Sequence, residues 1–167
     1  MPTKKQQEVY ITPEEDQTRL KEAEKKVDNY ALLSLAVGLT PTPFFDLAAL
    51  TAVQLKLVSD LADIYEQPFQ ENIVRSLLSS LTGWGVRGLI SRPLASMIKA
   101  IPGLGTLAGG MASSAFGYAS TYAIGKVFIL QFSSGSTIMT WDPEKVRDYY
   151  DEQFELGLKN KPENKQP

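Results

Sequence analysis

The chain has 167 residues, of which 43% are hydrophobic and 22% charged, and its formal net charge is −2. This length suits one domain, and the composition is that of a folded protein. The chain contains neither cysteine nor histidine, which excludes thiolate nucleophiles, disulfides, thiolate zinc sites and imidazole bases.

The charges are distributed unevenly along the chain. Residues 1–71 hold twelve acids and seven bases, and residues 142–167 hold seven acids and five bases. Between them, residues 72–141 contain no Asp or Glu, and their five bases are Arg75, Arg87, Arg92, Lys99 and Lys126. Such a stretch favours anionic lipid headgroups or an acidic partner. The alternative is that these bases pair with the acidic flanks inside one fold.

Residues 1–12 are predicted to be a flexible N-terminus without a signal peptide. Thr12, followed by Pro13 and by Glu15 three positions on, forms a capping-box pattern and predicts the start of a helix. This first helix is charged almost all round as far as Lys26, becomes apolar after Asn29, and is expected to stop at Gly38.

Two prolines spaced by one residue predict that the chain then turns back as an αα-hairpin. The second helix, about residues 43–65, repeats apolar residues every three or four positions, with Gln54 and Asp60 expected on its wetter side. The hairpin tip is predicted to face a membrane or a partner. It consists of Pro41, Pro43, Phe44, Phe45 and Asp46. Asp46 can equally be an ordinary acid in the first turn of a helix.

The third helix is expected to open at Pro68. Glycine weakens a helix by roughly 1 kcal/mol relative to alanine. Gly83, Gly85 and Gly88 therefore predict a kink or break around Trp84.

The fourth segment carries the strongest membrane signal. Twenty-six residues between Lys99 and Lys126 have no charge, whereas a bilayer span needs about 20 apolar residues. Close helix contact is predicted at Gly105, Gly109 and Gly110. Headgroup or interface contact is predicted for Arg87, Arg92, Lys99, Lys126, Trp84 and Trp141. A buried central helix of a water-soluble bundle, with its tryptophans filling the core, would give a similar sequence.

Asp142 and Pro143 predict the start of a last, amphipathic helix. Residues 13–158 are therefore expected to form a single helical domain, and residues 159–167 a disordered tail. The predicted fold class is an all-α bundle of about five helices, with an αα-hairpin and a central apolar helix rich in Gly, Ala and Ser.

Three short motifs together resemble a known family. They are AVGLTPTP at residues 36–43, KAIPG at 99–103 and STYAIGK at 120–126. The chain resembles the bacterial domain of unknown function six-nine-seven, a family that includes YcjF-like inner-membrane proteins and domains attached to Era-like GTPases. The resemblance implies an α-helical, membrane-linked module that works beside a GTPase. It implies no catalytic residues. These 167 residues contain no GTPase domain, so we expect either that the GTPase is a separate partner or that the link to a GTPase does not apply here.

The sequence thus predicts a non-catalytic, membrane-associating interaction module on the cytoplasmic side of a bacterial inner membrane. Membrane lipid, a separate GTPase and further copies of the chain are the expected partners. No cofactor, metal or nucleic-acid partner is expected. Two alternatives remain: a soluble structural or adaptor subunit that packs its apolar helix against protein, and a pore-like helical assembly.

Overall fold

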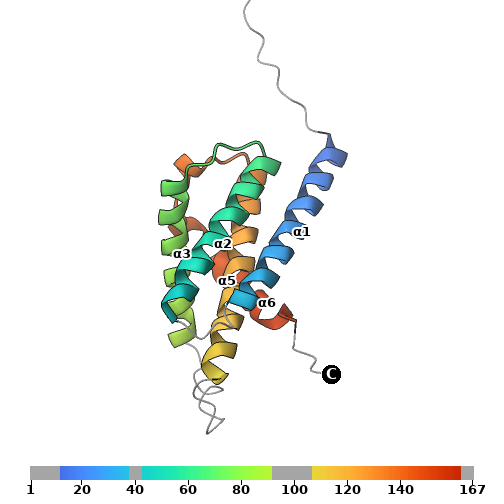
Figure 1. Ribbon diagram of the computed structural model, residues 1–167. Helices are drawn as coiled ribbons and strands as arrows, with labels where there is room; N and C mark the ends of the chain where they lie inside the picture. The colour runs from blue at the N-terminus through green and yellow to red at the C-terminus, as the bar shows by residue number, and fades with distance from the viewer. Residues whose placement is uncertain (1–11, 38–42, 92–106, 163–167) are drawn as a thin grey trace, which may run out of the picture.

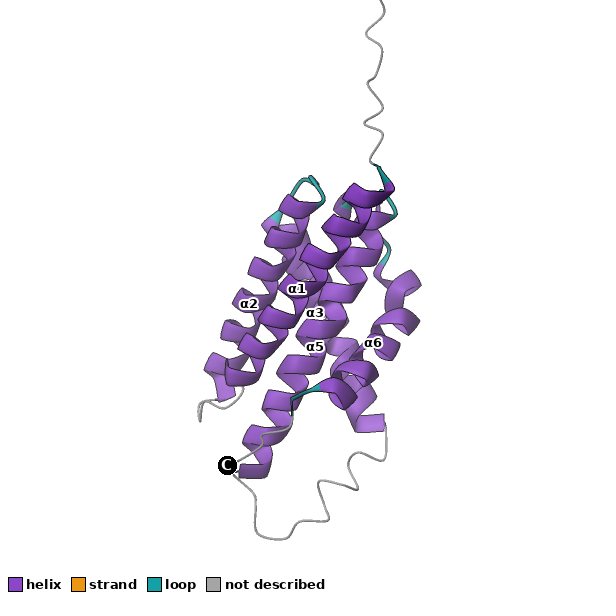
Figure 2. Ribbon diagram, turned by 90° about the vertical axis from the view of Figure 1, so that its right-hand side faces the viewer, coloured by secondary structure: helices purple, strands orange, loops and turns teal. Residues whose placement is uncertain are grey.

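The computed structural model describes residues 12–37, 43–91 and 107–162, and every regular element within them is a helix (Figures 1 and 2). The α-helices are α1 (Pro13–Val37), α2 (Pro43–Ile64), α3 (Glu71–Ser91), α5 (Leu107–Ser133) and α6 (Arg147–Asn160). Two short 3₁₀ turns, η1 (Ile138–Thr140) and η2 (Pro143–Val146), lie between α5 and α6. The predicted all-α bundle is confirmed.

The capping box at the start of α1 forms as predicted. The Glu15 carboxylate accepts a hydrogen bond of 2.9 Å from the Thr12 backbone N–H, and the Thr12 hydroxyl accepts one of 3.3 Å from the Glu15 N–H. The two proline-based starts also hold, since α2 begins at Pro43 and η2 at Pro143, where the Asp142 carboxylate accepts from the Glu144 N–H.

The predictions for α3 need two corrections. The helix begins at Glu71 and not at Pro68, with the Gln70 carbonyl accepting its first helical hydrogen bond from Val74. The expected break around Trp84 is also wrong, because α3 continues through the glycines to Ser91. A Cβ on Gly85 would lie 2.8 Å from the Tyr150 hydroxyl, so this glycine lets α3 and α6 approach closely.

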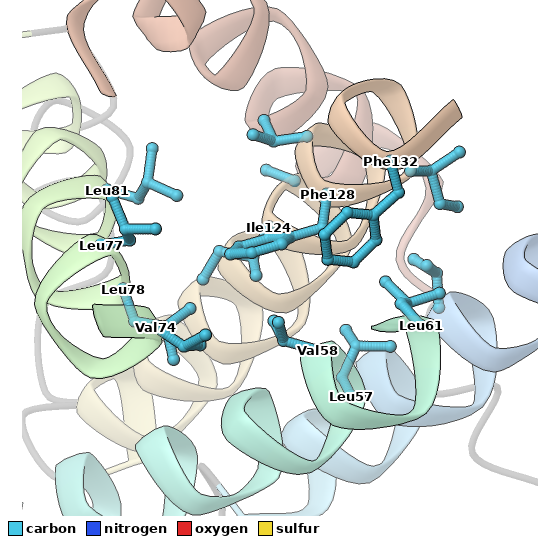
Figure 3. Packing of buried hydrophobic residues seen from close by; sticks show 14 of the residues in the cluster. Leu57, Val58, Leu61, Val74, Leu77, Leu78, Leu81, Ile124, Phe128 and Phe132 are labelled. Atoms are coloured by element: carbon cyan, nitrogen blue, oxygen red, sulfur yellow. The ribbon is translucent and has the colours of Figure 1, made fainter. Parts of the chain in front are cut away.

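The core lies around α5, which packs against α1, α2, α3 and α6. Figure 3 shows Ile124, Phe128 and Phe132 of α5 facing leucines and valines of α2 and α3. The residues of α5 from Ala119 to Phe132 include seven buried apolar side chains. The helix that the sequence favoured for membrane insertion is therefore the centre of a packed bundle. Among the described helices, none combines the length and apolarity needed to cross a membrane.

Candidate interaction surface

The centre of the bundle holds a buried polar cluster of Ser34, Gln54, Ser120, Thr121 and Tyr150. The Ser34 and Thr121 hydroxyls lie 2.7 Å apart, and the Gln54 amide donates to both Ser120 and Thr121. The Tyr150 hydroxyl donates to Ser120 over 3.4 Å, and burial raises the pKa of this phenol. The placement of Gln54 on a wetter side is thus wrong: it is 1% exposed. Because these groups satisfy one another, the cluster joins four helices and offers no free reactive group.

Lys126 also makes an internal contact. Its ammonium lies 2.7 Å from the Glu24 carboxylate of α1 and 5.5 Å from the centre of the Tyr122 ring, and the side chain is 19% exposed. Burial by itself lowers the pKa of Lys126, but the hydrogen bond and charge of Glu24 outweigh it and raise the pKa. Of the two alternatives for Lys126, headgroup contact and pairing with an acidic flank, the structure shows the pairing.

Both tryptophans pack against the core. The Trp141 ring meets the edge of Phe128 at 4.6 Å between centroids, and its indole N–H is buried without a hydrogen-bond partner. The sequence left two roles open for Trp84 and Trp141, contact with a membrane interface and filling of the core. Filling of the core accounts for the contacts of both.

Several predicted interface residues lie at one end of the bundle, although they are far apart in the sequence. Pro43, Phe44, Phe45 and Asp46 begin α2, Arg87 lies in the last turns of α3, and Gly109 and Gly110 lie in the first turn of α5. Figure 1 shows these helix ends together at the lower end. Pro41, Arg92, Lys99 and Gly105 lie outside the described residues.

Charge is nearly absent from this end. The low-charge end comprises residues 29–37 of α1, 43–55 of α2, 76–91 of α3 and 107–125 of α5. Asp46 and Arg87 are the only charged residues in these four ranges. By contrast, residues 13–28 of α1 contain ten charged residues. Because neighbouring helices run in opposite directions, one end of the bundle is poor in charge only if one helix carries its charges near its N-terminus and the next carries them near its C-terminus. The charges of α1, α2, α3 and α5 are arranged in this way.

Contacts between the helices show which residues of α1, α2 and α5 lie beside one another along the bundle axis at the low-charge end. The Ser114 hydroxyl donates to the Leu35 carbonyl over 3.1 Å, and a Cβ on Gly117 would lie 3.8 Å from Leu50. α6 is charged and reaches the level of this end on one side of the bundle, since its Gly157 packs against Ala119 of α5. The low-charge end is therefore limited to the stated ranges of α1, α2, α3 and α5.

Sequence reasoning missed one feature of this end. Leu32 and Leu33 of α1 are 46% and 49% exposed, and Leu47 of α2 is 59% exposed. The sequence did hold a signal for the exposure of Leu32 and Leu33. Together with Asn29 and Ala36 they follow helical spacing and form a second stripe along α1. The buried stripe of α1 is Ala23, Val27, Ala31 and Ser34.

Among the described residues, no group of three or more acids lies close enough together to hold a metal ion.

Comparison with known proteins finds a matching family model and a relative of similar sequence. The model of the family described as Domain of unknown function (DUF697) matches residues 6–157. Magnetosome membrane protein 22 of Magnetospirillum gryphiswaldense is 36% identical over 136 residues, which cover 81% of this chain and 70% of the relative. No solved structure matches the chain.

Proposed function

We propose, from the premise that this chain belongs to the Domain of unknown function (DUF697) family, that it is a non-catalytic helical module which attaches to a membrane. The observation that carries the proposal is the low-charge end, where four helices present almost no charge. A relative that is itself named a membrane protein supports it. Because charged side chains strongly disfavour entry into a bilayer, a charge-poor end is the part of the bundle that can approach lipid at least cost.

Attachment in this proposal is peripheral. Arg87, which lies in the last turns of α3, contacts anionic headgroups in this proposal, and so do Arg92 and Lys99, the next two bases in the sequence. Such headgroups attract basic residues by roughly 1 kcal/mol each. The charged half of α1 stays in the aqueous phase, on the cytoplasmic side of a bacterial inner membrane. There it is free to hold a protein partner such as a separate GTPase. Gly105, Gly109 and Gly110 are proposed as contacts between copies of the chain.

Flotation tests the proposal directly. The purified full chain is mixed with vesicles of neutral lipid or of neutral and anionic lipid, floated through a density gradient, and the bound fraction is washed with alkaline carbonate. We expect flotation on anionic vesicles and release by carbonate, because the attachment is peripheral. A chain that floats on neither kind of vesicle contradicts membrane attachment, and one that resists carbonate contradicts its peripheral character.

The packing of α5 favours a second candidate function, that of a soluble structural or adaptor subunit. The apolar side chains of α5 from Ala119 to Phe132 are already buried within the chain, so the bundle does not need lipid to cover them. Size-exclusion chromatography without detergent separates the two functions when it is combined with flotation. An adaptor remains a defined soluble species and never floats.

A further inference from the structure

The outer face of α1 changes its character halfway along the helix. The positions opposite the buried stripe are Glu22 and Lys25 in the first half, and Leu32, Leu33 and Ala36 in the second, and all five are exposed. Packing within the bundle does not explain the second half, since the buried stripe already supplies the contacts with α5. Two adjacent leucines, each about half exposed on a helix facing solvent, are therefore unexplained by the fold.

Leu47 extends this exposed apolar surface to α2. It lies three residues before Leu50 and seven before Gln54, so it continues the inward stripe of α2. It is nevertheless 59% exposed, although it lies only three residues from Leu50, which approaches Gly117 of α5. Ser34 and Gln54 bond to the same Thr121 hydroxyl, so they lie at the same level along the bundle. Leu33 is next to Ser34 and Leu47 is seven residues before Gln54, so Leu47 lies about two helical turns nearer the low-charge end than Leu33.

We propose that Leu32, Leu33 and Leu47, here called the leucine surface, insert into the interfacial layer of a lipid bilayer. This rests on the proposed function and specifies which described side chains enter the lipid. Amphipathic helices at interfaces bury their apolar face about 5–10 Å deep. Because Leu33 lies about two turns of helix from Leu47 along the bundle, both enter this layer when the bundle axis is tilted toward the bilayer surface. A bilayer is favoured over a protein as the occupant because the four helix ranges of the low-charge end contain only two charged residues, Asp46 and Arg87, so the scarcity of charge is not confined to the surroundings of the leucines.

The size of the effect follows from burial of leucine. Complete burial of one leucine side chain is worth about 1.5–3 kcal/mol, and each of these is already about half covered by protein. Each leucine should then raise the vesicle partition coefficient by roughly fivefold, and the three together by roughly a hundredfold. This contribution should persist at high salt, because apolar burial is not screened, whereas attraction between bases and headgroups weakens.

The test compares two triple variants of the full chain on anionic vesicles at low and high salt. The first is Leu32→Ser, Leu33→Ser and Leu47→Ser, for which we expect a roughly hundredfold loss of partitioning at both salt concentrations. The control is Leu20→Ser, Leu130→Ser and Met139→Ser, which removes three other apolar side chains that are 40%, 41% and 66% exposed. These lie away from the low-charge end, so partitioning should not change. Circular dichroism and thermal unfolding establish that both variants fold.

The outcomes separate the inference from the proposed function. If the unmodified chain binds vesicles and the first variant binds equally well, membrane attachment stands and the leucine surface is not its contact. If the two variants lose binding equally, general surface apolarity is responsible and the inference is wrong. If the unmodified chain never binds vesicles but forms oligomers that the first variant disperses, the surface is occupied by a second copy and both proposals fall.

Discussion

Gly125 and Gly117 set the distance between α1 and α5. A Cβ on Gly125 would lie 2.7 Å from Val27 Cγ1, and one on Gly117 would lie 2.9 Å from the Ser34 carbonyl oxygen. The two glycines are eight residues apart on one face of α5, so α1 approaches closely along its length. Gly117 and Gly125 therefore mediate close helix contact within the bundle. The contacts predicted at Gly105, Gly109 and Gly110 stay predictions.

The Gly125 contact predicts that Gly125→Ala destabilises the fold. The added methyl group forces Val27 or the helix backbone to move, and overpacking of this kind costs about 1–3 kcal/mol. Urea unfolding followed by circular dichroism measures the change in the free energy of unfolding. Gly83→Ala is the matched control, since nothing lies within 4 Å of its Cβ position, and it should stabilise α3 by up to about 1 kcal/mol. Equal stability of Gly125→Ala and the natural chain would show that α1 moves away freely.

At the scale of the elements, Asp60 joins α2 to α1. Its carboxylate accepts hydrogen bonds from Lys26 over 3.0 Å, from the Tyr30 hydroxyl over 2.9 Å, and from Lys56 of its own helix over 2.6 Å. Partial burial raises the pKa of Asp60, but these three hydrogen bonds outweigh it and hold the pKa below the ordinary value of 3.8. Lys56 lies four residues before Asp60 on one helix, so their pairing follows from local spacing, whereas the two partners from α1 appear only in the fold.

Asp60 therefore makes stability depend on pH. A carboxyl group whose pKa is lowered by folding stabilises the protein above its unfolded pKa, and this contribution is lost as the pH falls below 3.8. Asp60→Asn should lower the free energy of unfolding by about 1 kcal/mol at neutral pH, since both lysines are partly solvated. It should also reduce the loss of stability on acidification.

The exposed Asp63, one turn further along α2, provides the control for Asp60. Asp63→Asn should change the free energy of unfolding by no more than about 0.5 kcal/mol. Thermal unfolding of the natural chain and both variants across the acid range checks the prediction. Parallel acid profiles for the natural chain and Asp60→Asn would contradict the role given to this carboxylate.

At the scale of the whole molecule, the bundle is polarised along its axis. The charged halves of α1 and α2 lie at the end where α3 begins and α5 ends, and the low-charge end lies opposite (Figure 1). The leucine surface lies toward the low-charge end, whereas Met139 in η1 follows the end of α5. If the proposals hold, a membrane meets the low-charge end and leaves the opposite end in water.

This orientation can be measured with single fluorescent probes, because the natural chain contains no cysteine. Leu33→Cys and Met139→Cys each provide one labelling site on an exposed side chain. With anionic vesicles, an environment-sensitive dye at position 33 should shift to shorter wavelength and be quenched by quenchers attached to the lipid. The dye at position 139 should respond to neither. Equal responses at both positions would contradict binding through the low-charge end.

The sequence by itself determined where α1, α2 and η2 begin. The Thr12–Glu15 capping box, the helix start at Pro43 and the Asp142–Pro143 start depend on residues within four positions of one another, so local pattern was enough to find them. The apolar centre of α5 was likewise evident, because a long uncharged helix must be covered by protein or by lipid. These features indicated the fold class, and the three short motifs at residues 36–43, 99–103 and 120–126 indicated the family.

Only the tertiary structure decided whether protein or lipid covers α5. It also decided where the charged residues and the exposed leucines lie in the bundle. Lys126 could face headgroups or an acid until α1 placed Glu24 2.7 Å away. Leu32 and Leu33 look like core residues until Ala23, Val27 and Ala31 are seen to occupy the core-facing stripe. The low-charge end arises because neighbouring helices run in opposite directions. Helix direction and the choice of facing stripe depend on contacts between residues far apart in the sequence, and periodicity within one helix carries no information about them.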